Sequence, residues 1–234
     1  DGADDPSWTA ADIDTNADFA YDVYVADMDG DGDLDIVSAA VDDKTITWYE
    51  NDGAADPSWT AADIDTRAGS AREVHVADMD GDGDLDIVTA APDTSDLRRG
   101  PHVGWYENDG ASDPSWTRAT IDYTGNMEQD VHVADMDEDG DLDIVVVSYS
   151  DDTIAWYEND GAADPSWSAA DIANSADMPY AVYVADLDGD GDLDIVSGSR
   201  NDDTIAWYEN AGGSHFNSTK SSLENALNAG TSVT

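Results

Sequence analysis

The chain repeats itself four times, and this repetition constrains its fold more than any other feature. Its most regular segment reads VADMDGDGDLDIV from Val25 and from Val76, VADMDEDGDLDIV from Val133 and VADLDGDGDLDIV from Val184. The copies start 51, 57 and 51 residues apart. Two further markers, WYEN and DPSW, accompany the copies and contain all eight tryptophans. A fixed period of about 50 residues indicates a repeat architecture in which neighbouring units share a core.

Each unit has the pattern of four short β-strands. In the first unit we expect strands at residues 22–26, 34–38, 45–49 and 58–64, where apolar and polar residues alternate or β-branched residues gather. The Asn-Asp-Gly sequence at 51–53 is a turn signal between the last two. No repeat shows helical periodicity. The sequence therefore predicts an all-β fold, a β-propeller with one four-stranded blade per unit.

The ends of the chain suggest how the ring closes. The chain begins with a fourth-strand element, residues 7–14, and the last unit stops after its third strand, at Asn210. We expect four blades over residues 1–210, with the N-terminal strand completing the last blade and removing exposed sheet edges. The alternative is a strand-swapped homodimer, in which two chains form an eight-bladed ring. Residues 211–234 are rich in Gly, Ser and Asn, which predicts a tail or linker.

The loop between the first two strands carries the clearest chemistry. In the first copy an aspartate occupies every second position from 27 to 35, with Gly30 and Gly32 between them. Ca²⁺ prefers six to eight oxygen ligands at about 2.3–2.6 Å. Side chains at loop positions 1, 3, 5 and 9, with a backbone carbonyl at position 7, supply most of that shell. The sequence predicts about four Ca²⁺ ions per chain.

These loops are not EF-hands, although they begin in the same way. An EF-hand has a bidentate Glu at loop position 12. The four loops have Ser38, Thr89, Val146 and Ser197 there, and their flanks are predicted strands rather than helices. A sensor of the EF-hand type is therefore excluded.

The loops, the strand flanks and the repeat length together resemble the FG-GAP/VCBS repeat family of integrin-α-like propellers over residues 1–210. The Phe-Gly part of the family pattern is absent, and Glu138 replaces a loop glycine in the third copy. The resemblance implies side-chain ligands at positions 1, 3, 5 and 9 of each loop and a backbone carbonyl at position 7. The side-chain ligands would be Asp27, Asp29, Asp31, Asp35, Asp78, Asp80, Asp82, Asp86, Asp135, Asp137, Asp139, Asp143, Asp186, Asp188, Asp190 and Asp194, and the carbonyls those of Asp33, Asp84, Asp141 and Asp192.

Composition limits the partners. Acidic residues outnumber lysine and arginine 55 to 8, for a formal net charge of −47. Nucleic acids and anionic membranes are polyanions and are excluded as partners on this ground. No apolar run approaches the roughly 20 residues that span a bilayer. Cysteine is absent, which is compatible with a secreted or cell-surface protein in which Ca²⁺ takes the place of disulfides.

Two groups of residues are candidates for ligand contact. One is the tryptophan of each WYEN marker, because aromatic faces stack on sugars; the alternative is that these residues fill the core between blades. They are Trp48, Trp105, Trp156 and Trp207. The other is Arg98 and Arg99, in an insertion of the second repeat, which could bind an anionic sugar or simply pair with nearby aspartates.

His75 and His132 stand where the other two repeats have tyrosine. They could ligate a metal, although neutral residues of the core or central channel are the simpler interpretation. The chain has no G-x-S-x-G or HExxH motif and no cysteine nucleophile. We therefore expect a non-catalytic, calcium-binding adhesion or binding module with a glycan or protein ligand, lectin-like in the first case. The alternatives are a purely structural repeat domain of a surface protein and a carbohydrate-active enzyme.

Overall fold

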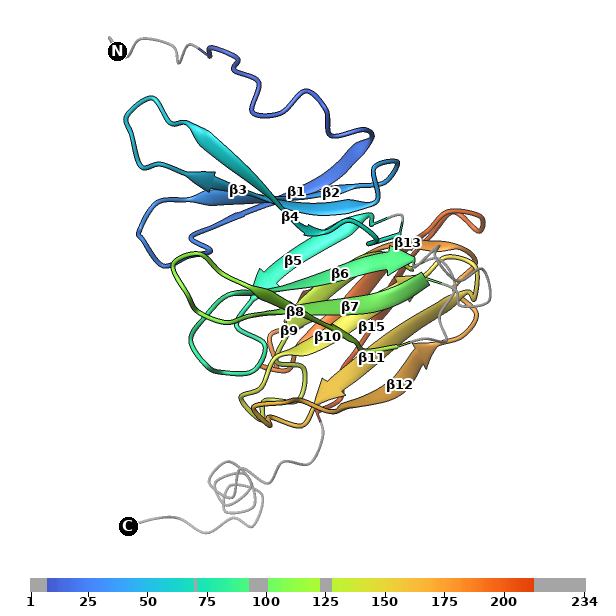
Figure 1. Cartoon of the computed structure of the whole chain (residues 1–234). Helices are drawn as coiled ribbons and strands as arrows, with labels where there is room; N and C mark the ends of the chain where they lie inside the picture. Colours follow the sequence, from blue (N-terminus) through green and yellow to red (C-terminus); the bar gives the residue numbers. More distant parts are fainter. Residues whose placement is uncertain (1–7, 70, 93–100, 123–127, 213–234) are drawn as a thin grey trace, which may run out of the picture.

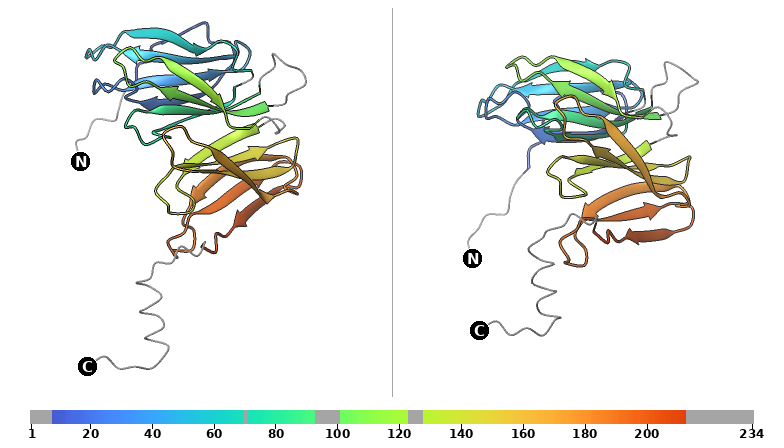
Figure 2. Two further views of the ribbon diagram at one scale, coloured as in Figure 1. Left: turned by 60° about the horizontal axis from the view of Figure 1, so that its bottom comes forward. Right: turned by 90° about the horizontal axis from the view of Figure 1, so that it is seen from below.

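A computed structural model describes residues 8–69, 71–92, 101–122 and 128–212. Within these residues the chain folds into fifteen strands that form four antiparallel sheets. The sheets follow one another in chain order around a common axis, from the first, blue, to the last, red (Figures 1 and 2). The predicted all-β, four-bladed propeller is confirmed as a propeller-like ring of antiparallel sheets.

The strands of each blade pair in sequence order. The first blade contains β1 (Ala20–Ala26), β2 (Asp35–Ala40), β3 (Thr45–Asn51) and β4 (Trp59–Asp65). The second contains β5 (Glu73–Ala77), β6 (Asp86–Pro92), β7 (Pro101–Asn108) and β8 (Trp116–Thr120). The third contains β9 (Glu128–Ala134), β10 (Asp143–Ser148), β11 (Thr153–Asn159) and β12 (Trp167–Ala173). The last contains β13 (Pro179–Ala185), β14 (Asp194–Ser199) and β15 (Thr204–Tyr208).

The first strand of each blade lies nearest the axis, and the fourth lies outermost. First strands of neighbouring blades contact one another, whereas β4 and β12 are largely exposed. Four rings follow one another around the axis: Tyr24, His75, His132 and Tyr183, with centroids 5.2, 5.7 and 4.9 Å apart. The two histidines therefore lie on the inner strands beside the axis, next to the tyrosines that occupy the same strand position.

In the described part of the chain the hydrophobic core consists of three clusters, one at each junction between successive blades. At the first junction Ile46 and Trp48 of one blade pack with Val74, Val76 and Ile87 of the next. Equivalent residues form the second and third clusters. A sheet face is apolar only where another blade covers it, so the repeat period of the sequence becomes the period of the core.

The last blade differs from the others because it has three strands among the residues that the structure describes. Residues 8–14, the predicted closing strand, form no strand, and β15 pairs only with β14. Closure of the ring by the N-terminal strand thus stays a prediction. Of the predicted tail at 211–234, only 211–212 lie within the described residues.

Candidate metal centres

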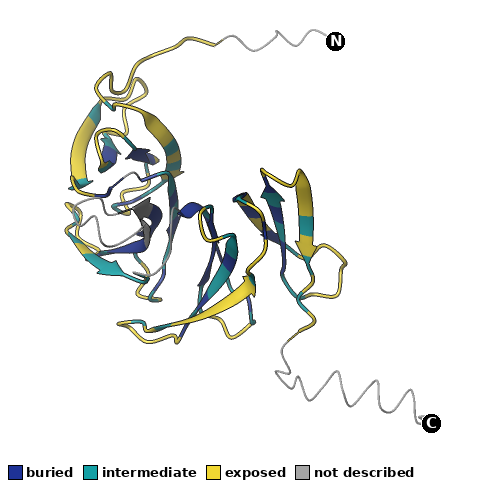
Figure 3. Ribbon diagram, turned by 90° about the vertical axis from the view of Figure 1, so that its right-hand side faces the viewer, coloured by how far each residue is buried: buried dark blue, intermediate teal, exposed yellow. Residues whose placement is uncertain are grey.

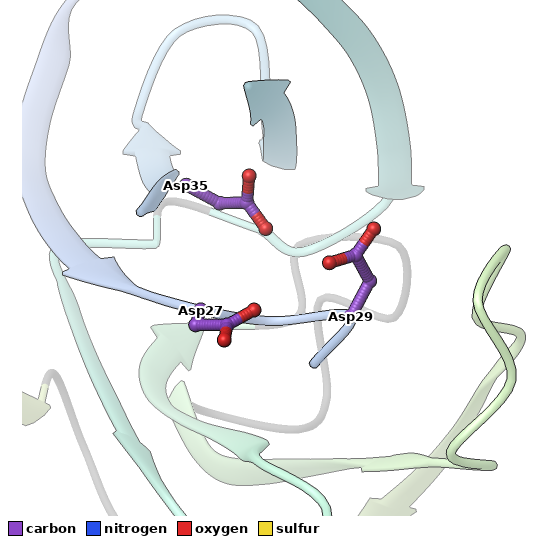
Figure 4. Close-up of side chains that lie close together, drawn as sticks. All are labelled: Asp27, Asp29 and Asp35. Carbon is purple, nitrogen blue, oxygen red and sulfur yellow. The ribbon is translucent and has the colours of Figure 1, made fainter. Parts of the chain in front are cut away.

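The first Asp loop brings three carboxylates together. Asp27 follows the inner strand β1, Asp29 lies in the loop, and Asp35 begins β2. Each offers an oxygen within 4.8 Å of the others, and Figure 4 shows the three side chains close together. Two oxygens that bind one Ca²⁺ at about 2.3–2.6 Å can lie no more than about 5 Å apart. The cluster therefore has the dimensions of a calcium site.

The same grouping occurs once in every blade. The other three clusters are Asp78, Asp80 and Asp86; Asp135, Asp137 and Asp139; and Asp186, Asp188 and Asp194. Each is formed by the connection between the first and second strands of its blade, so all four lie on the same face of the ring. The donors are all carboxylates, which hard cations such as Ca²⁺ prefer.

Backbone N–H groups donate to all three carboxylates, and the N–H of Asp31 binds Asp29 at 3.2 Å. Asp35 accepts hydrogen bonds from the N–H of Met28 at 3.1 Å and of Asn51 at 2.8 Å. Asp27 accepts one through Oδ2 from the N–H of Gly32 at 2.9 Å. Its other oxygen, Oδ1, is buried without a hydrogen-bond partner, as is Oδ1 of Asp135. A buried, unpartnered carboxylate oxygen is costly, and a cation in the cluster would satisfy it. The residues present thus fit Ca²⁺.

The seventh loop position behaves differently from the others. Asp33 directs its carboxylate away from the cluster, against Gly53 in the turn after β3, so closely that a Cβ at Gly53 would overlap it. Gly53 also has a φ of 67°, in the left-handed region. The same pairing joins Asp84 to Gly110 and Asp141 to Gly161. With its side chain turned outward, position 7 could contribute only its carbonyl to the loop centre, and ligation by that carbonyl stays a prediction.

The fifth position is the least regular. Asp31 accepts a hydrogen bond from the N–H of Asp33 at 2.8 Å and lies outside the cluster of its loop. In the third loop the order is reversed, because Asp139 joins the cluster and Asp143 does not. This loop is the one that carries Glu138, with a φ of 62°, in place of glycine. Ligation by the position-5 side chains of the other loops stays a prediction.

Burial shifts the ionisation of the position-9 aspartate in the second and third loops. It raises the pKa of Asp86 and of Asp143 to about 6, although the N–H groups that bind them act in the opposite direction. Removal of a carboxylate from water disfavours its charged form, and a nearby cation restores it. In these two loops the charged form of the position-9 carboxylate therefore has a cost that a divalent cation would offset.

The asparagine of the WYEN marker supports these sites, a role that the sequence did not reveal. The N–H of Asn108 donates to Asp86 at 2.8 Å, and its amide group donates to the carbonyls of Leu85 at 3.1 Å and Met28 at 3.0 Å. Met28 belongs to the loop of the preceding blade. Asn159 and Asn210 make the same set of bonds. One residue thus ties the position-9 aspartate of its own blade to the metal loop of its neighbour.

The other candidate residues are distributed unevenly. Trp48 and Trp105 are buried between blades and Trp156 partly so, which favours their packing role, whereas Trp207 is exposed. Arg98 and Arg99 lie outside the described residues. His75 and His132 are neighbours, but no cluster of three metal-ligating groups among the described residues includes them.

The fold and the loops define the class of protein: a repeat β-propeller in which each blade has an acidic loop with the carboxylate grouping of a metal site. The family model for the FG-GAP-like repeat matches residues 27–89 and 135–197, and the chain belongs to this family. The resemblance seen in the sequence is thereby confirmed. No curated protein matches the chain.

Proposed function

We propose that this chain is a non-catalytic, calcium-binding module that presents a glycan- or protein-binding surface outside the cell. The observation that carries the proposal is the recurrence, in all four blades, of three carboxylates whose oxygens lie within 4.8 Å of one another. Four such groups on one face make cation binding a property of the whole ring rather than of one blade.

The calcium ions act as structural staples in this proposal. With the predicted fourth side-chain ligand included, four carboxylates around one Ca²⁺ leave a local charge of about −2, and without the ion they repel each other. Ion binding and folding are then coupled, because ligands that bind only the folded state stabilise it. Extracellular calcium modules bind in the range of about 10⁻⁴–10⁻³ M. Constant occupancy at such concentrations suits a staple better than a sensor.

A rigid ring of this kind would serve recognition. Among the described residues no helix is both long and apolar enough to cross a membrane. The carboxylates that cluster within 4.8 Å of one another are those of the loops, and Ca²⁺ would occupy them. Because Ca²⁺ would occupy these carboxylates, a binding module is favoured over a carbohydrate-active enzyme. A structural repeat domain of a surface protein is the second candidate.

Calorimetry and thermal unfolding test the calcium part of the proposal. We expect about four Ca²⁺ per chain and a clear fall in melting temperature on addition of EDTA, since each site contributes about 2.7 kcal/mol when Ca²⁺ is at 100 times its Kd. A melting temperature that EDTA leaves unchanged would refute it.

Ligand arrays test the recognition part. Saturable binding to a glycan or protein array, lost with EDTA, supports the binding module. A flat response favours the structural domain. Release of sugar from polysaccharides, lost on mutation of a carboxylate outside the loops, would favour the enzyme.

A further inference from the structure

Successive blades pack through one pair of faces, and this pair occurs three times in the chain. We call the face of a blade that carries the first-strand valines, such as Val74 and Val76, its leading face. The face that carries the third-strand residues, such as Ile46 and Trp48, is its trailing face. At each junction the trailing face of one blade covers the leading face of the next.

None of the described residues covers the leading face of the first blade in this way. Val23 is 59% exposed, whereas its equivalents Val74, Val131 and Val182 are 2%, 2% and 7% exposed. Val25 and Leu34, on the same face, are exposed as well. The sequence at these positions is the same as in the other blades, so the difference is in what lies next to them.

The trailing face of the last blade is uncovered in the same way. Ile205 is 83% exposed, and its equivalents Ile46, Val103 and Ile154 are all at 0%. Trp207 and Leu187 are exposed on the same face. Figure 3 shows exposed strands, in yellow, in the first blade near the N-terminus and in the last blade near the C-terminus. The described blades therefore present two uncovered apolar faces that are the two halves of the repeated interface, and contiguous apolar surface of this kind marks an association site.

The two faces do not meet within the chain. The first and last blades touch through the hydroxyls of Tyr21 and Tyr180, which lie 2.7 Å apart, and do not pack as neighbouring blades do. To join the faces internally, the three existing junctions would have to rotate. Those junctions are closely packed, with Val37, Ile46 and Ile154 fully buried, and packed interiors resist such changes.

The N-terminal segment is already placed for an intermolecular junction. Tyr49 donates a hydrogen bond to Asp14 at 3.1 Å, as Tyr106 does to Asp65 of the preceding blade at 2.8 Å. Asp65 ends a fourth strand, so Asp14 lies where the fourth strand of a preceding blade would end. A preceding blade that lacks its fourth strand is what the last blade of a second copy offers.

We propose that the two end faces bind a second copy of this chain, trailing face to leading face at both junctions, to complete a ring of eight blades. Residues 8–14 of each copy then supply the fourth strand of the partner's last blade. The side chain of Asn51, which donates to Leu34 of its own blade, gains the bond to the preceding blade that Asn108 makes to Met28. Two copies related by a twofold axis satisfy both faces without changing any existing junction.

Light scattering of the full chain tests the proposal. With millimolar CaCl₂ and about 1 M NaCl, which reduces the Debye length to about 3 Å and screens the net charge, we expect a molar mass of twice 24.9 kDa. Val25→Asp on the leading face and Trp207→Asp on the trailing face should each shift the mass toward 24.9 kDa. Ala162→Asp adds the same charge in an exposed turn and should leave the dimer intact.

A mixture of the two variants makes the test specific. The Val25→Asp chain keeps an intact trailing face and the Trp207→Asp chain an intact leading face, so together they form one complete junction. The mixture should therefore regain a dimer that neither variant forms alone. Unchanged calcium stoichiometry in both variants shows that they are folded. A wild-type mass of 24.9 kDa at all concentrations, or a mixture that stays monomeric, would overturn the proposal.

Discussion

The hydroxyl of Tyr49 donates a hydrogen bond to the carboxylate of Asp14 at 3.1 Å. Tyr157 makes the same bond to Asp122 of the blade before it, at 2.6 Å. The WYEN tyrosine thus fastens its blade to the outer strand of the preceding one, and at the first blade the N-terminal segment takes that place.

This relationship predicts different outcomes for two equivalent substitutions. Tyr49→Phe should release the N-terminal segment, so that amides of residues 8–17 exchange faster by hydrogen-exchange mass spectrometry while global stability changes little. Tyr157→Phe breaks a bond between two complete blades and should cost about 1 kcal/mol of global stability. Equal exchange at residues 8–17 in wild type and Tyr49→Phe would show that the bond does not hold the segment.

The Asp loops predict a pair of variants with equal charge and unequal effect. Asp29→Ala removes a carboxylate of the first cluster and should lower the calorimetric stoichiometry by one Ca²⁺ per chain. Asp33→Ala removes the same charge from a side chain that points away from the cluster, so it should keep the full stoichiometry. Loss of a site in both variants would mean that net charge, rather than ligation, governs binding.

The turn after β3 predicts a steep difference between two glycines. Gly53→Ala combines a left-handed φ of 67° with overlap of the new methyl group and the Asp33 carboxylate, so we expect at least 1 kcal/mol of destabilisation by denaturant unfolding. Gly198→Ala in β14 meets no atom within 4 Å and should be neutral or stabilising. Similar losses at both positions would contradict this account of the turn.

The WYEN asparagines predict that a junction can be weakened without touching the metal ligands. Asn108→Ala removes the side-chain bonds to Met28 and Leu85 and should cost about 1–3 kcal/mol, since two buried carbonyls lose their donor. Asn51→Ala removes, in the single chain, only bonds within its own blade, to the carbonyl of Leu34 and from the N–H of Gly53, so it should cost less at protein concentrations where the chain is monomeric. Thermal unfolding with saturating Ca²⁺ separates the two, and an equal loss would argue against the inter-blade role.

Glu128 predicts a pH dependence of stability. It is buried, one of its oxygens has no hydrogen-bond partner, and burial raises the pKa of its carboxyl from 4.5 to about 8. The folded state therefore holds the proton more tightly than the unfolded state. The stabilisation that this gives is complete below about pH 4.5 and is lost as the pH rises through 8.

Glu128→Gln should abolish this loss. We expect its melting temperature to exceed that of the wild type at pH 9 by several degrees, since about 1 kcal/mol corresponds to 2–4 °C for a chain of this size. The difference should vanish near pH 4.5. Asp164→Asn, in an exposed turn, is the control and should show no such trend. A pH-independent effect of Glu128→Gln would point to packing instead.

Much of the fold could be predicted because the same pattern of strands and loops occurs in four repeats of the sequence. Alternation placed the inner strand of the first blade at 22–26, and the structure has it at Ala20–Ala26. The spacing of Asp27, Asp29 and Asp35 likewise identified residues that the structure brings together. Local pattern is sufficient where strand and loop are contiguous in the sequence.

What the sequence could not predict depends on neighbours. Val23 and Val74 occupy the same place in nearly the same sequence, yet one is exposed and the other buried, because only Val74 has a blade before it. The hydrogen bond from Asn108 to Met28 joins two neighbouring blades across 80 residues of sequence, and the WYEN marker by itself does not predict it. The choice between Asp139 and Asp143 in the third cluster also needed coordinates, since both fit the loop pattern.

Strand β15 is paired on one side only, and residues 8–14, which form no strand themselves, are the segment proposed to pair with its other side. A strand that is paired on one side only exposes a row of backbone donors and acceptors, which is a template for uncontrolled aggregation. When residues 8–14 of a second copy pair with β15, these backbone groups are covered. The solubility of the propeller then depends on a short N-terminal segment that is about 190 residues away from β15 in the sequence. Deletion of residues 8–14 should therefore make the protein prone to aggregation while every blade remains folded.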